Sequence, residues 1–308
     1  MQRVLDAIQT FWEHLADVHV APLAVAVLCH VVKLACTSRA WRNVLAAAYP
    51  DERVRWRSIY AAYVAGVGVN AIFPARAGDV MRIYLAHRAI PGSSYATLIS
   101  STLVLTIVDF SFACGLFVWA LTQGVLPGFG VLPSLPSFDF RWLAQHDVVL
   151  QIVIVVLVLG LIALAVWIRS GWQEFKARVA QAFTVLRTPV RYLRTVAAWQ
   201  LCDWALRLAT IWFVLGAFDI HQSVRNVLLV QASSSLATLV PVSPGGIGTE
   251  QAFLLYILRG QATRTALLAF SVGMKITLTA VNAAVGFTAI LLTLGTLRFR
   301  RVTERSNP

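Results

Sequence analysis

Two apolar stretches of this sequence end in proline before they are long enough to cross a membrane. Ser58–Phe73 stops at Pro74, and Val227–Val240 stops at Pro241. A helix needs roughly 20 apolar residues, at about 1.5 Å each, to cross ~30 Å of hydrocarbon. Inside a membrane, backbone that leaves the helix must be buried by protein or lined by water, because each N–H and C=O needs a partner. Both breaks are therefore expected inside a bundle of other helices.

Five further apolar stretches are long enough to cross. The chain is 58% hydrophobic and 13% charged over 308 residues, which is too apolar for a soluble globular protein. We predict an all-α, polytopic membrane helix bundle with about five full spans plus two interrupted or re-entrant segments. The predicted spans are Val18–Ser38, Ala96–Gln123, Val148–Ile168, Ala197–Phe218 and Thr265–Leu297.

The last of these spans is longer than a bilayer is thick. It is expected to tilt strongly or to bend near Gly273, Asn282 or Gly286. The remaining chain divides simply: residues 1–17 are predicted as an amphipathic N-terminal segment, residues 18–297 as a single transmembrane domain, and residues 298–308 as a basic cytoplasmic tail.

Basic residues gather in a few of the connecting segments and indicate orientation. The net charge of +12 comes from clusters between apolar stretches, which favours anionic lipids over nucleic acid as the partner. The positive-inside rule places these clusters, and the C-terminus, on the cytoplasmic side of the plasma or inner membrane. With the N-terminus outside, five spans fit this rule only if each short segment returns to its own side. An alternative in which Ser58–Phe73 crosses stays open. The clusters include Arg39, Arg42, Arg53, Arg55, Arg57, the Arg169–Arg194 segment, Arg298, Arg300 and Arg301.

The two breaks share an outline, in which proline and glycine precede an acidic residue. In "NAIFPARAGDVMR", Pro74 removes a hydrogen-bond donor and Gly78 permits a positive φ. In "PVSPGGIGTEQAF", glycines expose N–H groups where Glu250 opens a new helix, and the helix dipole favours anions there. If the segments enter from opposite faces, they form an inverted pair of the kind that builds transporter sites. The expected substrate-binding residues are Asn70, Pro74, Arg76, Gly78, Asp79, Arg82, Ser243, Pro244, Gly245, Gly246, Gly248 and Glu250.

Four charged residues lie within predicted spans, where charge is costly and usually functional. Asp203 and Arg207 are four residues apart, so they are expected to pair on one helix face. Asp109 and Lys275 have no such local partner and are expected to face the bundle interior, where they can pair with each other. His30 and Lys33, near the inner end of the first span, are interpreted as interfacial.

The two broken segments resemble the signature stretches of the lysylphosphatidylglycerol synthase transmembrane-region family, also described as flippase-like membrane proteins. The resemblance extends over most of the chain and implies movement of a lipid or lipid-linked molecule between leaflets. Larger relatives carry a soluble aminoacyl-transferase domain, which we expect to be absent here. The resemblance also implies a Glu-Arg pair four and three positions before Asp109, where this sequence has Leu105 and Thr106.

The sequence contains no pattern typical of an enzyme site. It has no Walker sequence, no Rossmann glycine pattern and no His-Glu-x-x-His, and its 4 cysteines show no metal spacing. We therefore expect a non-enzymatic protein without cofactor or metal, and a phospholipid or polyprenyl-linked lipid as its partner. Two alternatives stay open: an integral membrane transferase that uses Asp79 and Glu250, and a non-catalytic scaffold that binds enzymes of envelope synthesis.

Overall fold

The computed structural model describes residues 18–73, 76–122, 176–239, 249–258 and 260–305, and within these ranges it contains helices and no strand. The all-α prediction is confirmed. Three helices in these ranges are long and apolar enough to cross a membrane, namely Val20–Ala48, Tyr95–Ala120 and Arg264–Thr293. They correspond to the first, second and fifth predicted spans. The third, Val148–Ile168, and the N-terminal segment 1–17 lie outside the described residues.

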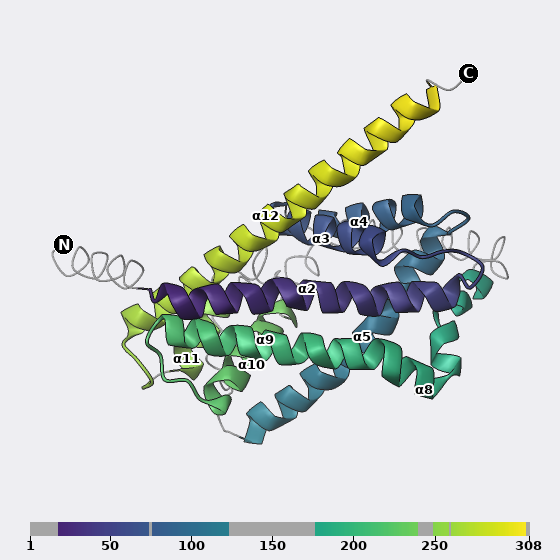
Figure 1. Ribbon diagram of the computed structural model, residues 1–308. Coiled ribbons are helices and arrows are strands. Elements are labelled where there is room, and N and C mark those ends of the chain that lie inside the picture. The colour runs from purple at the N-terminus through teal and green to yellow at the C-terminus, as the bar shows by residue number, and fades with distance from the viewer. Residues whose placement is uncertain (1–17, 74–75, 123–175, 240–248, 259, 306–308) are drawn as a thin grey trace, which may run out of the picture.

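Helices α2 (Val20–Ala48) and α9 (Ala198–Ala217) lie side by side and antiparallel through the middle of the molecule (Figure 1). At one end, the His19 N–H donates to the Ala217 carbonyl at 2.9 Å. At the other, the Asn43 amide donates to the Thr195 carbonyl at 2.6 Å. Short turns η2 (Thr184–Arg187), α8 (Pro189–Tyr192) and η3 (Leu193–Ala197) lead into α9.

Two helices extend beyond their predicted spans. Helix α2 continues past Ser38 to Ala48, because Trp41, Val44 and Leu45 are fully buried and hold its last turns in the core. Helix α12 (Arg264–Arg305) runs for 42 residues as a single helix through all three positions at which a bend was predicted. It lies inclined to α2 (Figure 1).

The first short segment forms a helical hairpin. Helix α3 (Trp56–Ile72) is followed by α4 (Ala77–Ala89), which packs back against it. The two ends of the hairpin meet, since the Ser94 N–H donates to the Tyr49 hydroxyl at 3.0 Å. Helix α5 (Tyr95–Thr122) follows. The hairpin thus leaves and returns at the C-terminal end of α2.

The second short segment is also a hairpin, made of α10 (Val224–Leu239) and α11 (Thr249–Ile257). Its two ends meet where the Asn226 amide donates to the Gln261 side-chain oxygen at 3.4 Å. The turn before α10 lies at the N-terminal end of α2, where His19 contacts Asp219 at 3.1 Å. The two hairpins therefore start from opposite ends of α2.

Each hairpin has its own apolar core. Trp41, Ile59 and Leu98 are buried in the core around α3 and α4. The core around α10 and α11 contains Leu254 and Phe270, the second from α12. Burial of these apolar side chains fixes each hairpin against the long helices.

The first hairpin touches α12 backbone to backbone. A Cβ atom added to Gly68 of α3 would lie 2.6 Å from the Cα atom of Gly286 in α12. Within the hairpin, Gly66 and Gly78 allow the same close approach of α3 to α4. Small residues let helices approach closely in membranes, so these glycines specify the contacts.

Candidate functional site

A polar pocket of about 330 Å³ lies among five helices. It is lined mainly by charged, amide and hydroxyl side chains, an unusual lining among helices this apolar. Helix α2 contributes His30 and Lys33, and the other helices contribute Arg207, Thr210, Ile211, Gln231, Ser234, Glu250, Met274, Lys275, Leu278, Thr279 and Asn282.

Glu250 of α11 accepts contacts from two other helices. The Ser234 hydroxyl of α10 donates to its Oε1 at 2.6 Å, and the Lys275 ammonium of α12 donates to its Oε2 at 3.2 Å. The carboxylate is buried, and its pairing with Lys275 lowers the cost of a charge among apolar helices. Glu250 lies in the first turn of α11, so the prediction that it opens a new helix is confirmed.

Asp203 and Arg207 form the predicted i, i+4 pair on α9. The Arg207 guanidinium donates to Asp203 Oδ2 at 2.9 Å, and the Thr37 hydroxyl of α2 donates to Oδ1 at 2.5 Å. The Asp203 side chain is only 4% exposed. Asp203 therefore lies behind the pocket and holds Arg207 at its wall, while Thr37 ties the pair to α2.

His30 and Lys33 line the pocket, so their interpretation as interfacial residues is wrong. His30 shares a 2.8 Å hydrogen bond with the Asn282 side chain of α12. Helix α2 continues well beyond Lys33, which places both residues in its interior instead of at its end. The signal in the sequence was the spacing of His30, Lys33 and Thr37, which puts three polar side chains on one helix face.

The expected pairing of Asp109 with Lys275 is wrong. Asp109 of α5 accepts a 2.9 Å hydrogen bond from the Trp204 indole of α9, and Lys275 pairs with Glu250. The partners come from other helices, whose proximity a local search for opposite charge does not detect. Trp204 also carries the Arg207 guanidinium over its ring, 4.7 Å from the centroid.

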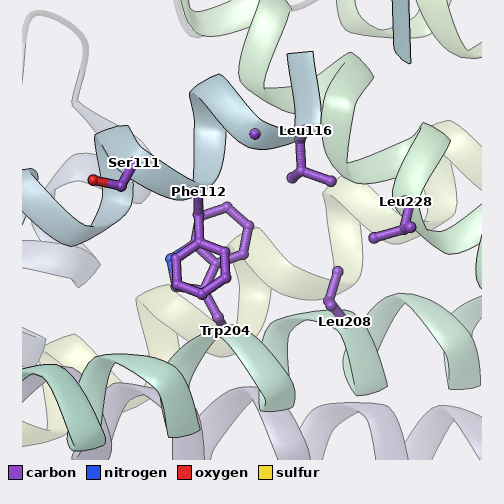
Figure 2. A pocket seen from close by; sticks show the side chains of 7 residues that line it. Ser111, Phe112, Leu116, Trp204, Leu208 and Leu228 are labelled. Atoms are coloured by element: carbon purple, nitrogen blue, oxygen red, sulfur yellow. The ribbon is translucent and has the colours of Figure 1, made fainter. Parts of the chain in front are cut away.

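Trp204 separates the polar pocket from an apolar one. This second cavity, of about 390 Å³, is lined by side chains of α5, α9 and α10. Figure 2 shows Phe112 and Leu116 of α5 facing Trp204 and Leu208 of α9, with Leu228 of α10 at one side. The Phe112 and Trp204 rings stack with centroids 4.9 Å apart. One helix, α9, thus presents a charged side chain to one cavity and an indole ring to the other.

The first motif forms a separate network around Asp79. Its carboxylate accepts from the Asn70 amide at 3.2 Å and lies 3.5 Å from Arg82 and 3.8 Å from Arg76. Asn70 also accepts from the Gly78 N–H at 2.8 Å. These residues are brought together as predicted, but the described lining of the polar pocket contains none of them.

Two details of this motif differ from expectation. The positive φ occurs at Arg76, with φ 57°, and not at Gly78, which lies within α4 and serves the close contact with Gly66. Arg82 packs over the rings of Trp41 and Tyr63, at 5.3 and 5.8 Å from their centroids. Arg82 is therefore held by protein, while the Arg76 side chain is 88% exposed.

The family model for the lysylphosphatidylglycerol synthase TM region matches residues 5–303. The chain belongs to this family. It is also similar to the UPF0104 membrane protein MJ1078 of Methanocaldococcus jannaschii, with 19% identity over 192 residues, 62% of this chain and 79% of the relative. No solved structure matches the chain.

As a member of the lysylphosphatidylglycerol synthase TM region family, the chain is an integral membrane protein. Leu105 and Thr106 stand where the resemblance implied a Glu-Arg pair beside Asp109. The Leu105 carbonyl accepts a hydrogen bond from the Gln200 side chain at 2.6 Å. A polar contact between α5 and α9 is therefore present at this position without the Glu-Arg pair. In this family member, the partner of Asp109 is an indole.

Six expected site residues of this family member lie outside the described residues: Pro74, Ser243, Pro244, Gly245, Gly246 and Gly248. Where the chain is described, no group of three or more His, Cys, Asp or Glu side chains is arranged to hold a metal ion. The pocket offers Lys33, Arg207 and Lys275 as cations and Glu250 as the single carboxylate of its described lining. Such a lining suits a small anionic group that also bears hydrogen-bonding atoms.

Proposed function

We propose that this protein translocates a lipid, or a lipid-linked molecule, with an anionic head group between the two leaflets of the membrane. The polar pocket receives the head group, and the activity is transport and not group transfer. The observation that carries the proposal is the pair of cavities on either side of Trp204 and Arg207, one charged and one apolar.

The two cavities match the two parts of a lipid. A charged head group crosses hydrocarbon at a high cost in free energy, which cationic and hydroxyl side chains at mid-depth lower. An acyl or polyprenyl chain needs only an apolar surface, which Phe112, Leu116 and Leu208 supply. Because α9 forms one wall of each cavity, the proposal assigns the head group and the chain of one lipid to the two sides of this helix. Family membership supports the same class of substrate.

We further propose a topology in which both hairpins re-enter the membrane from opposite faces. Their ends close at Tyr49 and Ser94 on one side and at Asn226 and Gln261 on the other, which supports this arrangement. The clusters of arginine assign the Tyr49 side, and the C-terminus, to the cytoplasm of a plasma or inner membrane. Broken helices that meet from opposite faces are a common way to build a transport site.

A leaflet-exchange assay in liposomes tests the function. Purified protein is reconstituted with labelled phosphatidylglycerol, a zwitterionic phospholipid or a polyprenyl phosphate, and Glu250→Gln is compared with the wild type. Selective exchange that is lost in the variant supports translocation through this pocket. If folded wild-type protein exchanges no lipid, the proposal is overturned in favour of a transferase or a scaffold.

A further inference from the structure

His30 is the one side chain in the described lining of the polar pocket whose type ordinarily changes charge near neutral pH. It lies on α2, one turn before Lys33, and is only 5% exposed. Its Nε2 atom lies 2.8 Å from Oδ1 of Asn282 on α12. An amide oxygen only accepts hydrogen bonds, so Nε2 carries the hydrogen and donates it. Nδ1 is then the nitrogen of the ring that can take up a proton.

The described charged groups of this region balance one another. Arg207 and Lys275 each form a salt bridge with one carboxylate. Asp109 lies outside the pocket, but it interacts electrostatically with Lys33 and Arg207 and balances the remaining cation. With His30 neutral, the net charge of the region is therefore zero. The balanced set consists of three cations and three carboxylates: Lys33, Arg207, Lys275, Asp109, Asp203 and Glu250.

The charged groups that act on His30 come from α2 and α9. Lys33 and Arg207 oppose a positive charge on the ring, and Asp203 favours one. Two cations outweigh one carboxylate, and burial disfavours a further charge, so His30 is neutral in the empty pocket. The other elements of this region contribute groups that are paired, hydrogen-bonded or uncharged: Glu250 of α11, Lys275 of α12, Asp109 of α5, Gln231 and Ser234 of α10, and Tyr63 of α3.

We infer that the polar pocket binds one proton together with one anion, and that Nδ1 of His30 takes this proton up from water. An anion that enters a balanced site leaves an excess negative charge, which a medium of low dielectric disfavours. Protonation of His30 removes the excess and leaves the salt bridges of Asp203 and Glu250 intact. By linkage, the anion and the proton each strengthen the binding of the other.

The inference rests on the proposed function and adds a source of energy to it. A proton that crosses with the anion moves it from the acidic to the alkaline side of the membrane. A monoanion and a proton together carry no net charge, so the membrane potential contributes little to the driving force. A pH gradient should therefore drive net movement of an anionic lipid, and a diffusion potential should not.

Proton uptake on binding tests the inference without transport. The probe is dihexanoyl phosphatidylglycerol, whose single negative charge does not titrate near neutral pH, and the full-length protein is kept in detergent. Calorimetry in two buffers of different ionisation enthalpy gives the number of protons taken up per anion bound. We expect about one proton near neutral pH, and binding that weakens about tenfold for each rise of one pH unit there. Absence of uptake, or absence of binding, would overturn the inference.

Variants at histidine assign the proton to its atom. His30→Gln should reduce the uptake to near zero and remove the pH dependence of binding, since glutamine can still contact Asn282 but does not titrate. His221→Gln removes an exposed histidine and serves as the matched control, which should take up a proton as the wild type does. Uptake that persists in His30→Gln contradicts the assignment and indicates a carboxylate such as Asp109 instead.

Nuclear magnetic resonance provides a second measurement on the unsubstituted protein. With nitrogen-15 in the 6 histidines, addition of the probe at constant pH should shift the signals of one imidazole to those of the protonated ring. If all six rings keep their signals while the probe binds, His30 takes up no proton and the inference is overturned.

The outcomes separate this inference from the proposed function. Proton uptake that depends on His30, in a protein that exchanges no lipid in liposomes, overturns translocation and keeps the proton-linked anion site. Lipid exchange without proton uptake, at a rate that a pH gradient does not change, keeps translocation and overturns the coupling.

Discussion

The Lys275 ammonium of α12 lies 3.2 Å from the Glu250 carboxylate of α11, and this ion pair closes one wall of the polar pocket. It joins the second hairpin to α12, the longest of the described helices. The pair is costly to break from the Lys275 side, because the buried Glu250 carboxylate is then left without its counter-ion.

Exchange of the two charges tests the pair. Glu250→Lys or Lys275→Glu alone should destabilise the protein by about 3 kcal/mol and abolish exchange, since two like charges then face each other. The double variant Glu250→Lys/Lys275→Glu should recover part of both. The measurements are the melting temperature in detergent and leaflet exchange in liposomes.

A mismatched double variant provides the control for this exchange. Lys275→Glu combined with Asp109→Lys corresponds to the pairing that is absent from the structure, so it should recover nothing. Recovery there, with none in the Glu250 and Lys275 double variant, contradicts the observed pairing.

The pairing also illustrates what the sequence could predict. The i, i+4 spacing of Asp203 and Arg207 lies within one helix and was sufficient to predict their contact. The partners of Asp109 and Lys275 lie on other helices, and no spacing within one helix contains that information. Hydrophobic length predicted the helices well, because the cost of exposed backbone in hydrocarbon is a local property.

The ends of helices and the extent of the site were harder to predict. Helix α2 outlasts its apolar stretch because Trp41 and Leu45 are buried by the first hairpin, a tertiary contact. Because α2 extends to Ala48, Lys33 lies in the interior of the helix and lines the pocket, and not at the end of a span as expected. Both short segments form hairpins, but the similarity of their motifs did not show that Asp79 and Glu250 belong to separate networks.

The glycine contact between α3 and α12 should tolerate no side chain. Gly286→Leu is expected to lower stability by about 1–3 kcal/mol, because Gly68 and its neighbouring backbone leave no room for the new atoms. Gly115→Leu on α5 is the matched control, since a Cβ there meets no atom within 4 Å. Melting temperatures of the two variants give the comparison, and equal values contradict close packing as the role of Gly286.

Substitutions at Arg76 and Arg82 should have different effects on the stability of the protein. Arg82→Gln is expected to cost about 1–2 kcal/mol, since Arg82 packs over two aromatic rings and contacts Asp79. Arg76→Lys should leave stability unchanged, because its side chain is exposed and its contact to Asp79 is long.

If Arg76 binds a lipid phosphate, Arg76→Lys should still reduce exchange, since lysine lacks the planar fork of arginine. Parallel measurement of folded yield, melting temperature and exchange rate distinguishes the two roles. Equal loss of yield and exchange in Arg76→Lys indicates a structural role instead.

The positions of the hairpin ends predict which residues are labelled from the same side of the membrane. Arg55 and Ser94 flank the first hairpin, and the contact between Tyr49 and Ser94 holds its ends together. If this hairpin re-enters, cysteines at positions 55 and 94 should react with an impermeant reagent from one face. Cysteines that replace Ser223 and Gln261, at the ends of the second hairpin, should react from the other face. The measurement needs a background in which Cys29, Cys36, Cys114 and Cys202 are replaced. Labelling of positions 55 and 94 from opposite faces means that the chain crosses the membrane once between them, so the first hairpin does not re-enter and the inverted arrangement is lost.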